Sequence, residues 1–184
     1  MLRVALLVVG AALAGCSDRP TPVSVETPRG TISYKERVRP DDGTFEAGLR
    51  GLTVAESERL KAGARSATSL IERYVPQQSR QTDLLENLDL AFAAWLNSSS
   101  PNKESVSEIE LIIGAALGQY CIDRLPVRWA VAKDEQGNEF VVVGENPPSR
   151  SYPFASVRYR IEDGKTDFVG ALYEALVHLR QKTS

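Results

Sequence analysis

Residues 105–143 read SVSEIELIIGAALGQYCIDRLPVRWAVAKDEQGNEFVVV, and the fold depends on a change of pattern inside this stretch. Before Pro126, apolar residues recur at spacings of three and four, which predicts a helix with Ser105 and Glu108 as its capping box. After Pro126, apolar and polar residues alternate over 127–132, which predicts a strand. The stretch therefore predicts a helix followed directly by β-structure.

The alternating pattern continues toward the C-terminus. Residues 134–138 have the composition of a turn and lead into a second predicted strand over 139–143, apolar from Phe140 onward, which predicts a β-hairpin. Residues 144–153 hold three prolines and are predicted as a loop. Residues 155–161 alternate again and predict a third strand, after which Thr166 is expected to cap a last helix.

Two further helices are predicted on the N-terminal side. Thr53 and Glu56 form a capping box at the start of the first, and Pro76 ends it. The second begins near Thr82 and ends at the Ser- and Pro-rich break over 97–101. The predicted fold class is therefore α+β: helices followed by a small three-stranded antiparallel sheet and a C-terminal helix.

The N-terminus has the pattern of an export signal. One basic residue, Arg3, precedes an apolar run that ends in Leu-Ala-Gly and then Cys16. A membrane-spanning helix needs about 20 apolar residues, and this run is shorter, so we interpret it as a secretory leader. Leu-Ala-Gly-Cys resembles the lipobox of bacterial lipoproteins. That resemblance implies cleavage before Cys16 and lipidation of its thiol; an ordinary leader followed by an unrelated cysteine is the alternative.

The lipoprotein resemblance also implies a location. Serine at position 17 is typical of lipoproteins that are exported to the outer membrane and face the periplasm. Retention at the inner membrane, again on the periplasmic side, is the alternative, because Asp18 follows one position later. Anchoring of this kind is stable, since it supplies two or more lipid chains.

This interpretation divides the chain into three parts. Residues 1–15 are predicted as the signal peptide, 16–51 as a lipid-anchored flexible tether, and 52–184 as a single domain. The tether is rich in proline and glycine, and within it only residues 31–38 alternate enough to predict a short strand.

Charge and cysteine content narrow the function. The 22 basic and 24 acidic residues give a net charge of −2, and this balance argues against a nucleic-acid partner, which requires a basic surface. If Cys16 carries lipid, Cys121 has no partner for a disulfide within the chain. We interpret Cys121 as a small buried hydrophobe, with a reactive thiol or an intermolecular bridge as the alternative.

Catalytic and cofactor motifs do not stand out in the sequence. The single histidine, His178, lies near the end of the last predicted helix, where a favourable interaction with the helix dipole is expected. We predict no metal site and no cofactor, because no ligand cluster or phosphate-binding motif accompanies that histidine. Gly114 and Gly118 lie one turn apart and are predicted to allow close packing against the helix, with a ligand niche as the alternative.

Three arginines form the predicted binding face. If the apolar residues of 155–161 face the core, Arg158 and Arg160 point to the opposite side of the sheet. Arg128 alternates with its apolar neighbours in the same way. Guanidinium groups on one face are suited to bind a carboxylate or an acidic partner. The alternative is a solvated face with exposed ion pairs.

Residues 109–179 resemble an uncharacterised bacterial family of small α+β domains. The resemblance lies in IGAALG from Ile113, RWAVAKDEQG from Arg128, PFASV from Pro153 and RIEDG from Arg160. It implies the fold and no activity.

Together these patterns favour a non-catalytic, lipid-anchored periplasmic domain that binds an envelope protein or a cell-wall component. The alternatives are an envelope hydrolase that uses carboxylates, and a periplasmic immunity or inhibitor protein. The carboxylate pairs Glu108/Glu110 and Asp134/Glu135 are interpreted as solvated surface.

Overall fold

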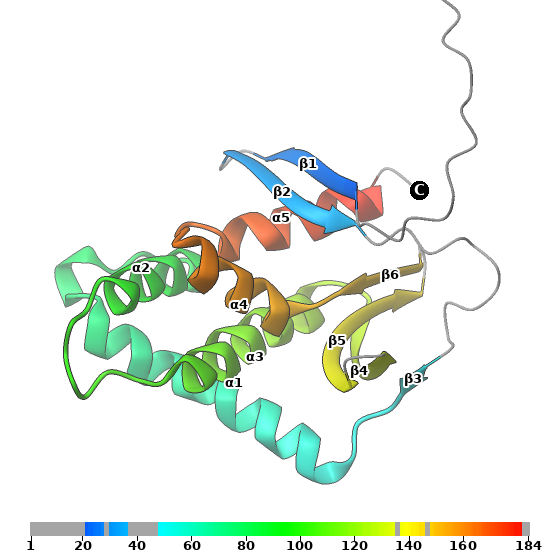
Figure 1. Ribbon diagram of the computed structural model, residues 1–184, viewed down its shortest axis with the longest axis horizontal. Helices are drawn as coiled ribbons and strands as arrows, with labels where there is room; N and C mark the ends of the chain where they lie inside the picture. Colours follow the sequence, from blue (N-terminus) through cyan, green and yellow to red (C-terminus); the bar gives the residue numbers. More distant parts are fainter. Residues whose placement is uncertain (1–20, 28–29, 37–47, 135–136, 146–147, 182–184) are drawn as a thin grey trace, which may run out of the picture.

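The computed structural model describes residues 21–27, 30–36, 48–134, 137–145 and 148–181. Figure 1 shows a group of helices beside a small sheet, with a separate hairpin over the last helix. In chain order the elements are β1 (Thr21–Thr27), β2 (Gly30–Glu36), β3 (Leu49–Arg50), α1 (Val54–Tyr74), η1 (Gln77–Ser79), α2 (Leu84–Leu96), α3 (Val106–Arg124), β4 (Val127–Asp134), β5 (Gly137–Glu145), β6 (Pro148–Ser151), α4 (Pro153–Asp163) and α5 (Val169–Gln181).

Both predicted capping boxes are confirmed. At α1 the Thr53 side chain accepts a hydrogen bond from the Glu56 amide, and the Glu56 carboxylate accepts one from the Thr53 amide. Ser105 and Glu108 make the same reciprocal pair at α3. These contacts satisfy amides that a helix start leaves without an intrahelical partner, so each helix begins where its local sequence places it.

Helix α3 lies at the centre of the molecule, between α1 and α4 (Figure 1). Its glycines permit this position, as predicted. Gly114 is in contact with Phe154 of α4, and a β-carbon placed on Gly118 would overlap the Trp129 ring of β4. Much of the main core is built from fully buried side chains of α2 and α3, which include Leu88, Phe92, Ile109, Ile113 and Leu117.

The sheet has four antiparallel strands in the order β3–β4–β5–β6. The predicted hairpin is confirmed as β4 and β5, with Trp129 opposite Val142. These two residues face the helices and join the main core. The other face is buried as well, because Leu49 and Tyr152 pack against the small side chains of Ala130, Ala132, Val141 and Val143.

The predicted third strand over 155–161 is wrong, because these residues lie in helix α4. Phe154, Val157 and Ile161 are spaced by three and four, and this helical stripe faces the core while Tyr159 is 53% exposed. Pro153 at the first turn and Gly164, with φ of +63° at the C-cap, mark a helix at both ends.

The other two strands of the sheet, β6 and β3, come from segments that the sequence predicts to be a loop and the end of the tether. Strand β6 lies inside the predicted loop over 144–153, and its Pro148 is tolerated because it begins an edge strand. Strand β3 comes from the last residues of the predicted tether and pairs with β4.

The predicted tether also contains a hairpin. The short strand expected over 31–38 corresponds to β2, which pairs antiparallel with β1. Figure 1 shows this hairpin against α5, and both strands contact that helix. The predicted signal peptide, residues 1–15, and Cys16 lie outside the described residues.

Candidate functional site

A polar cleft of about 390 Å³ opens where α1, the start of α2 and the end of α3 meet. Asp83 lies at its edge because it is the N-cap of α2, where its Oδ1 accepts hydrogen bonds from the amides of Leu85 and Glu86. The remaining oxygen, Oδ2, accepts the hydroxyl of Tyr120 at 3.1 Å. This contact fixes the start of α2 against α3 and leaves a carboxylate at the cleft wall.

Tyr120 supplies the aromatic part of the cleft. Its ring packs edge-on against Tyr173 of α5 with the ring centroids 5.0 Å apart. Burial raises the pKa of Tyr120, and the hydrogen bond to Asp83 acts in the same direction. The hydroxyl therefore stays protonated near neutral pH and serves as a hydrogen-bond donor.

The Arg124 guanidinium lies over the Tyr120 ring, with its central carbon 3.6 Å from the ring centroid. A guanidinium held over an aromatic face is stabilised by the ring quadrupole, and its N–H groups stay free to bind other partners. Asp123 is the second carboxylate of the cleft, and its Oδ1 accepts a hydrogen bond from Gln119 Nε2 at 2.8 Å. One cation and two carboxylates thus line one small cavity.

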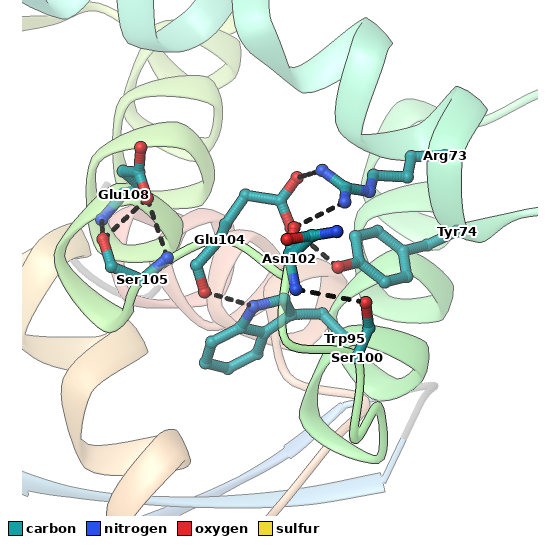
Figure 2. Close-up of polar contacts among 8 residues, drawn as sticks. All are labelled: Arg73, Tyr74, Trp95, Ser100, Asn102, Glu104, Ser105 and Glu108. Carbon is teal, nitrogen blue, oxygen red and sulfur yellow. Dashed lines mark hydrogen bonds and ion pairs between the residues drawn. The ribbon is translucent and has the colours of Figure 1, made fainter.

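A second polar cluster holds the loop between α2 and α3 in position. Figure 2 shows the Glu104 carboxylate between Arg73 and Tyr74, which donate to it at 2.8 and 2.7 Å. The Glu104 carbonyl accepts from the Trp95 indole at 2.9 Å, and Arg73 also donates to the Asn102 carbonyl at 2.6 Å. The Glu104 carboxylate thus attaches the loop to α1, and the Glu104 carbonyl attaches it to α2.

A third polar contact is buried. Asp89 of α2 is 7% exposed, and its carboxylate accepts the amides of Phe168, Val169 and Gly170 at the start of α5. This side chain replaces the cap that we predicted from Thr166, which is exposed. Asp89 therefore attaches the last helix to the second through the unpaired amides of a helix start.

The predicted placement of Arg158 and Arg160 on a strand of the sheet is wrong, because both lie on helix α4. Arg158 and Arg160 lie two residues apart on α4, which in a helix places them about 200° apart. Arg158 pairs with Glu110 of α3 through two contacts, at 3.2 and 3.3 Å, and this pairing raises the pKa of Arg158. Arg128 lies on β4 and pairs with Glu145 at 3.3 Å. The three arginines do not share a sheet face.

Cys121 is fully buried, as predicted for a small hydrophobe, and burial raises its thiol pKa to about 12. His178 is half-buried near the end of α5. Within the described ranges, no group of three or more His, Cys, Asp and Glu side chains is placed to hold a metal ion.

The buried thiol gives a first testable prediction. In a Cys16→Ser chain, Cys121 is expected to react with a disulfide reagent at pH 8 at least about 1,000-fold more slowly when folded than in concentrated urea. The reagent reacts only with the thiolate, and the buried Cys121 side chain must first become accessible through opening of the folded domain. Such opening costs several kcal/mol, because the fold is stabilised by about that amount. Reagent absorbance followed over time measures both rates. Rapid, complete labelling of the folded chain would contradict the assignment of Cys121 to the core.

The fold and the cleft define a small α+β domain built around one central helix. Residues 91–173 match the family model described as Domain of unknown function (DUF3806). This agrees with the resemblance to an uncharacterised family noted over 109–179. The match begins inside α2 and ends inside α5, so it includes Tyr120 and Arg124 and leaves out Asp83. No curated protein and no solved structure matches the chain.

Sequence reasoning did not identify the cleft. Its one local signal was Asp83, since an aspartate directly before an apolar helical run is a typical N-cap. The approach of Arg124 to Tyr120 follows from their i, i+4 spacing on α3. The joining of these residues into one cavity depends on how α1, α2 and α3 pack, which no local pattern encodes.

Proposed function

We propose that this protein is a lipid-anchored component of the bacterial cell envelope whose folded domain binds a ligand or partner in the periplasm without catalysing a reaction. The observation that carries the binding role is the cleft. There, Arg124 makes no ion pair with the described residues, although Asp83 and Asp123 line the same cavity. A concave site with a few convergent polar groups is the usual form of a binding site.

The other polar groups support a non-catalytic role. The Asp89 carboxylate is held by three amides, and Glu104 is held by Arg73 and Tyr74. The Cys121 thiol is buried and protonated near neutral pH. These candidates for acid–base or nucleophilic chemistry are engaged in structural contacts, which favours binding over hydrolysis.

The proposed location at the outer membrane rests on the sequence that precedes the folded domain. The lipobox pattern at Cys16 supports lipid anchoring, and Ser17 supports the outer membrane over the inner membrane. None of the helices in the described part of the chain has the length and apolar character needed to span a membrane. In this proposal the lipid holds the domain at the membrane surface, facing the periplasm.

The anchoring proposal predicts a specific labelling result. In a bacterial host fed an alkyne analogue of palmitate, the full chain is expected to take up label and to sediment with outer-membrane fractions. A Cys16→Ala chain is expected to lose the label, because the acylated residue is gone. Gel fluorescence of density-gradient fractions measures both. Equal labelling of the two chains, or wild-type chain without label, would overturn the anchor.

The binding proposal is tested separately. A low-molecular-mass extract of the cell envelope is expected to raise the melting temperature of the purified full chain, because a ligand that binds only the folded state stabilises it. The same extract is expected to have little effect on an Arg124→Gln chain. An equal shift for both chains, or no shift for either, would contradict binding at this cleft.

A further inference from the structure

We infer that the cleft between α1, α2 and α3 takes a small ligand that carries one carboxylate together with two ammonium groups, such as a basic amino acid. The inference rests on the proposed binding function and names the ligand class of the same cleft. It is argued from the charge, geometry and size of the cavity.

The carboxylate of the ligand is assigned to Arg124. A guanidinium is a planar fork whose N–H groups match a carboxylate with two parallel hydrogen bonds. Here the group is already ordered by its position over the Tyr120 ring. Because this contact orders the side chain before a ligand arrives, less conformational freedom is lost on binding.

The ammonium groups are assigned to Asp83 and Asp123. Asp83 directs one oxygen to its helix cap and the other to Tyr120, and Asp123 uses one oxygen for Gln119. Each carboxylate oxygen has more than one acceptor position, so both side chains retain acceptor capacity. One positive and two negative side chains give the cleft a net charge of −1. A simple anion is disfavoured by that charge, whereas a ligand with two ammonium groups and one carboxylate balances it.

The size and the apolar wall agree with this class. The cavity of about 390 Å³ lies near the lower end of the range of about 300–1,000 Å³ that is typical of small-molecule sites. Leu84 is 37% exposed, and Ala64 and Ala116 line the same cavity, which gives the aliphatic part of an amino acid a surface to cover.

The test is calorimetric titration of the full chain, purified in detergent, with four probes. L-Lysine has all the groups required, L-norleucine lacks the second ammonium, cadaverine lacks the carboxylate, and hexanoate lacks both ammonium groups. Saturable binding of lysine at one site is expected, with weaker binding of norleucine. Cadaverine and hexanoate are expected to bind at least about ten-fold more weakly than lysine, because each leaves charged groups of the cleft unpaired.

Variants locate the binding. Arg124→Gln is expected to weaken lysine binding at least about ten-fold, and Arg124→Lys less, since it keeps the charge and loses the fork. Arg59→Gln, a change of the same kind at an exposed position of α1 outside the cleft lining, is expected to have no effect. Circular dichroism melts confirm that each variant is folded, and Arg124→Lys provides the test if Arg124→Gln does not fold.

Two results would overturn the inference. One is the absence of heat with lysine and norleucine alike, and the other is hexanoate binding as tightly as lysine. The failure of the ligand class is distinguishable from failure of the proposed function. An envelope extract that stabilises the wild type but not Arg124→Gln, combined with no lysine binding, removes the ligand class and retains the binding role.

Discussion

Replacing Asp89 with alanine is expected to lower the free energy of unfolding by about 4 kcal/mol, within the range for removing one partner of a buried polar contact. The carboxylate accepts the amides of Phe168 and Val169 at 2.7 Å each and that of Gly170 at 3.1 Å. Alanine leaves these three amides without their side-chain partner at a site where the Asp89 side chain is only 7% exposed. The midpoint of urea denaturation and its slope measure the loss.

Asp89→Asn separates hydrogen bonding from charge. Its amide oxygen can keep the two contacts that Oδ1 makes, so the expected loss is smaller, about 1–2 kcal/mol. Asp163→Ala, the same change at an exposed position on α4, is the matched control and should cost less than about 0.5 kcal/mol. If Asp89→Ala unfolds at the same urea concentration as Asp163→Ala, the buried cap does not stabilise the fold.

Through the same carboxylate, the free energy of unfolding is expected to depend on pH. Burial raises the pKa of Asp89 above its ordinary value of 3.8, and the three amide hydrogen bonds only partly oppose this effect. The folded state therefore binds the proton more tightly than the unfolded state. The contribution of this group to stability is fully present below about pH 3.8 and falls as pH rises through the raised pKa. Measured relative to Asp89→Asn, wild-type stability should decline over that interval.

The contrast between α3 and α4 shows what the sequence can predict. Helix α3 begins at Ser105, where both partners of the capping box lie within four residues, so local chemistry determines the boundary. In α4, Val157, Tyr159 and Ile161 alternate by chance over a short segment. The helical stripe that includes Phe154 becomes evident only when the packing against α3 is known.

The cleft between α1, α2 and α3 could not be predicted from the sequence for a related reason. Asp83 and Arg124 lie on different helices, and their shared cavity results from the packing of α1, α2 and α3. The interaction of Asp89 with the start of α5 spans about 80 residues of chain. A charged residue on an apolar helix face is a signal for such a contact, since a buried charge needs partners, but it does not name the partner.

The second large effect is expected at Gly118. Alanine there should raise helix propensity by about 1 kcal/mol and still lower the free energy of unfolding by about 2 kcal/mol overall. The reason is that a β-carbon at this position would overlap Cη2 and Cζ2 of the Trp129 ring. That ring packs between the main core and Phe154, so a shift away from α3 disturbs both. Urea denaturation measures the net change.

Gly114→Ala provides the comparison on the same helix. Its β-carbon would lie 3.1 Å from Cγ of Phe154, a distance that small shifts can relieve, so the net effect should stay within about 1 kcal/mol of wild type. Trp129→Val removes the ring, and Gly118→Ala added to it should then cost nothing or stabilise, because only the propensity gain remains. If Gly118→Ala destabilises by the same amount with and without the Trp129 ring, contact between α3 and β4 is not the reason for the glycine. A difference of about 2–3 kcal/mol between the two backgrounds would assign Gly118 to the close approach that places the sheet against the central helix.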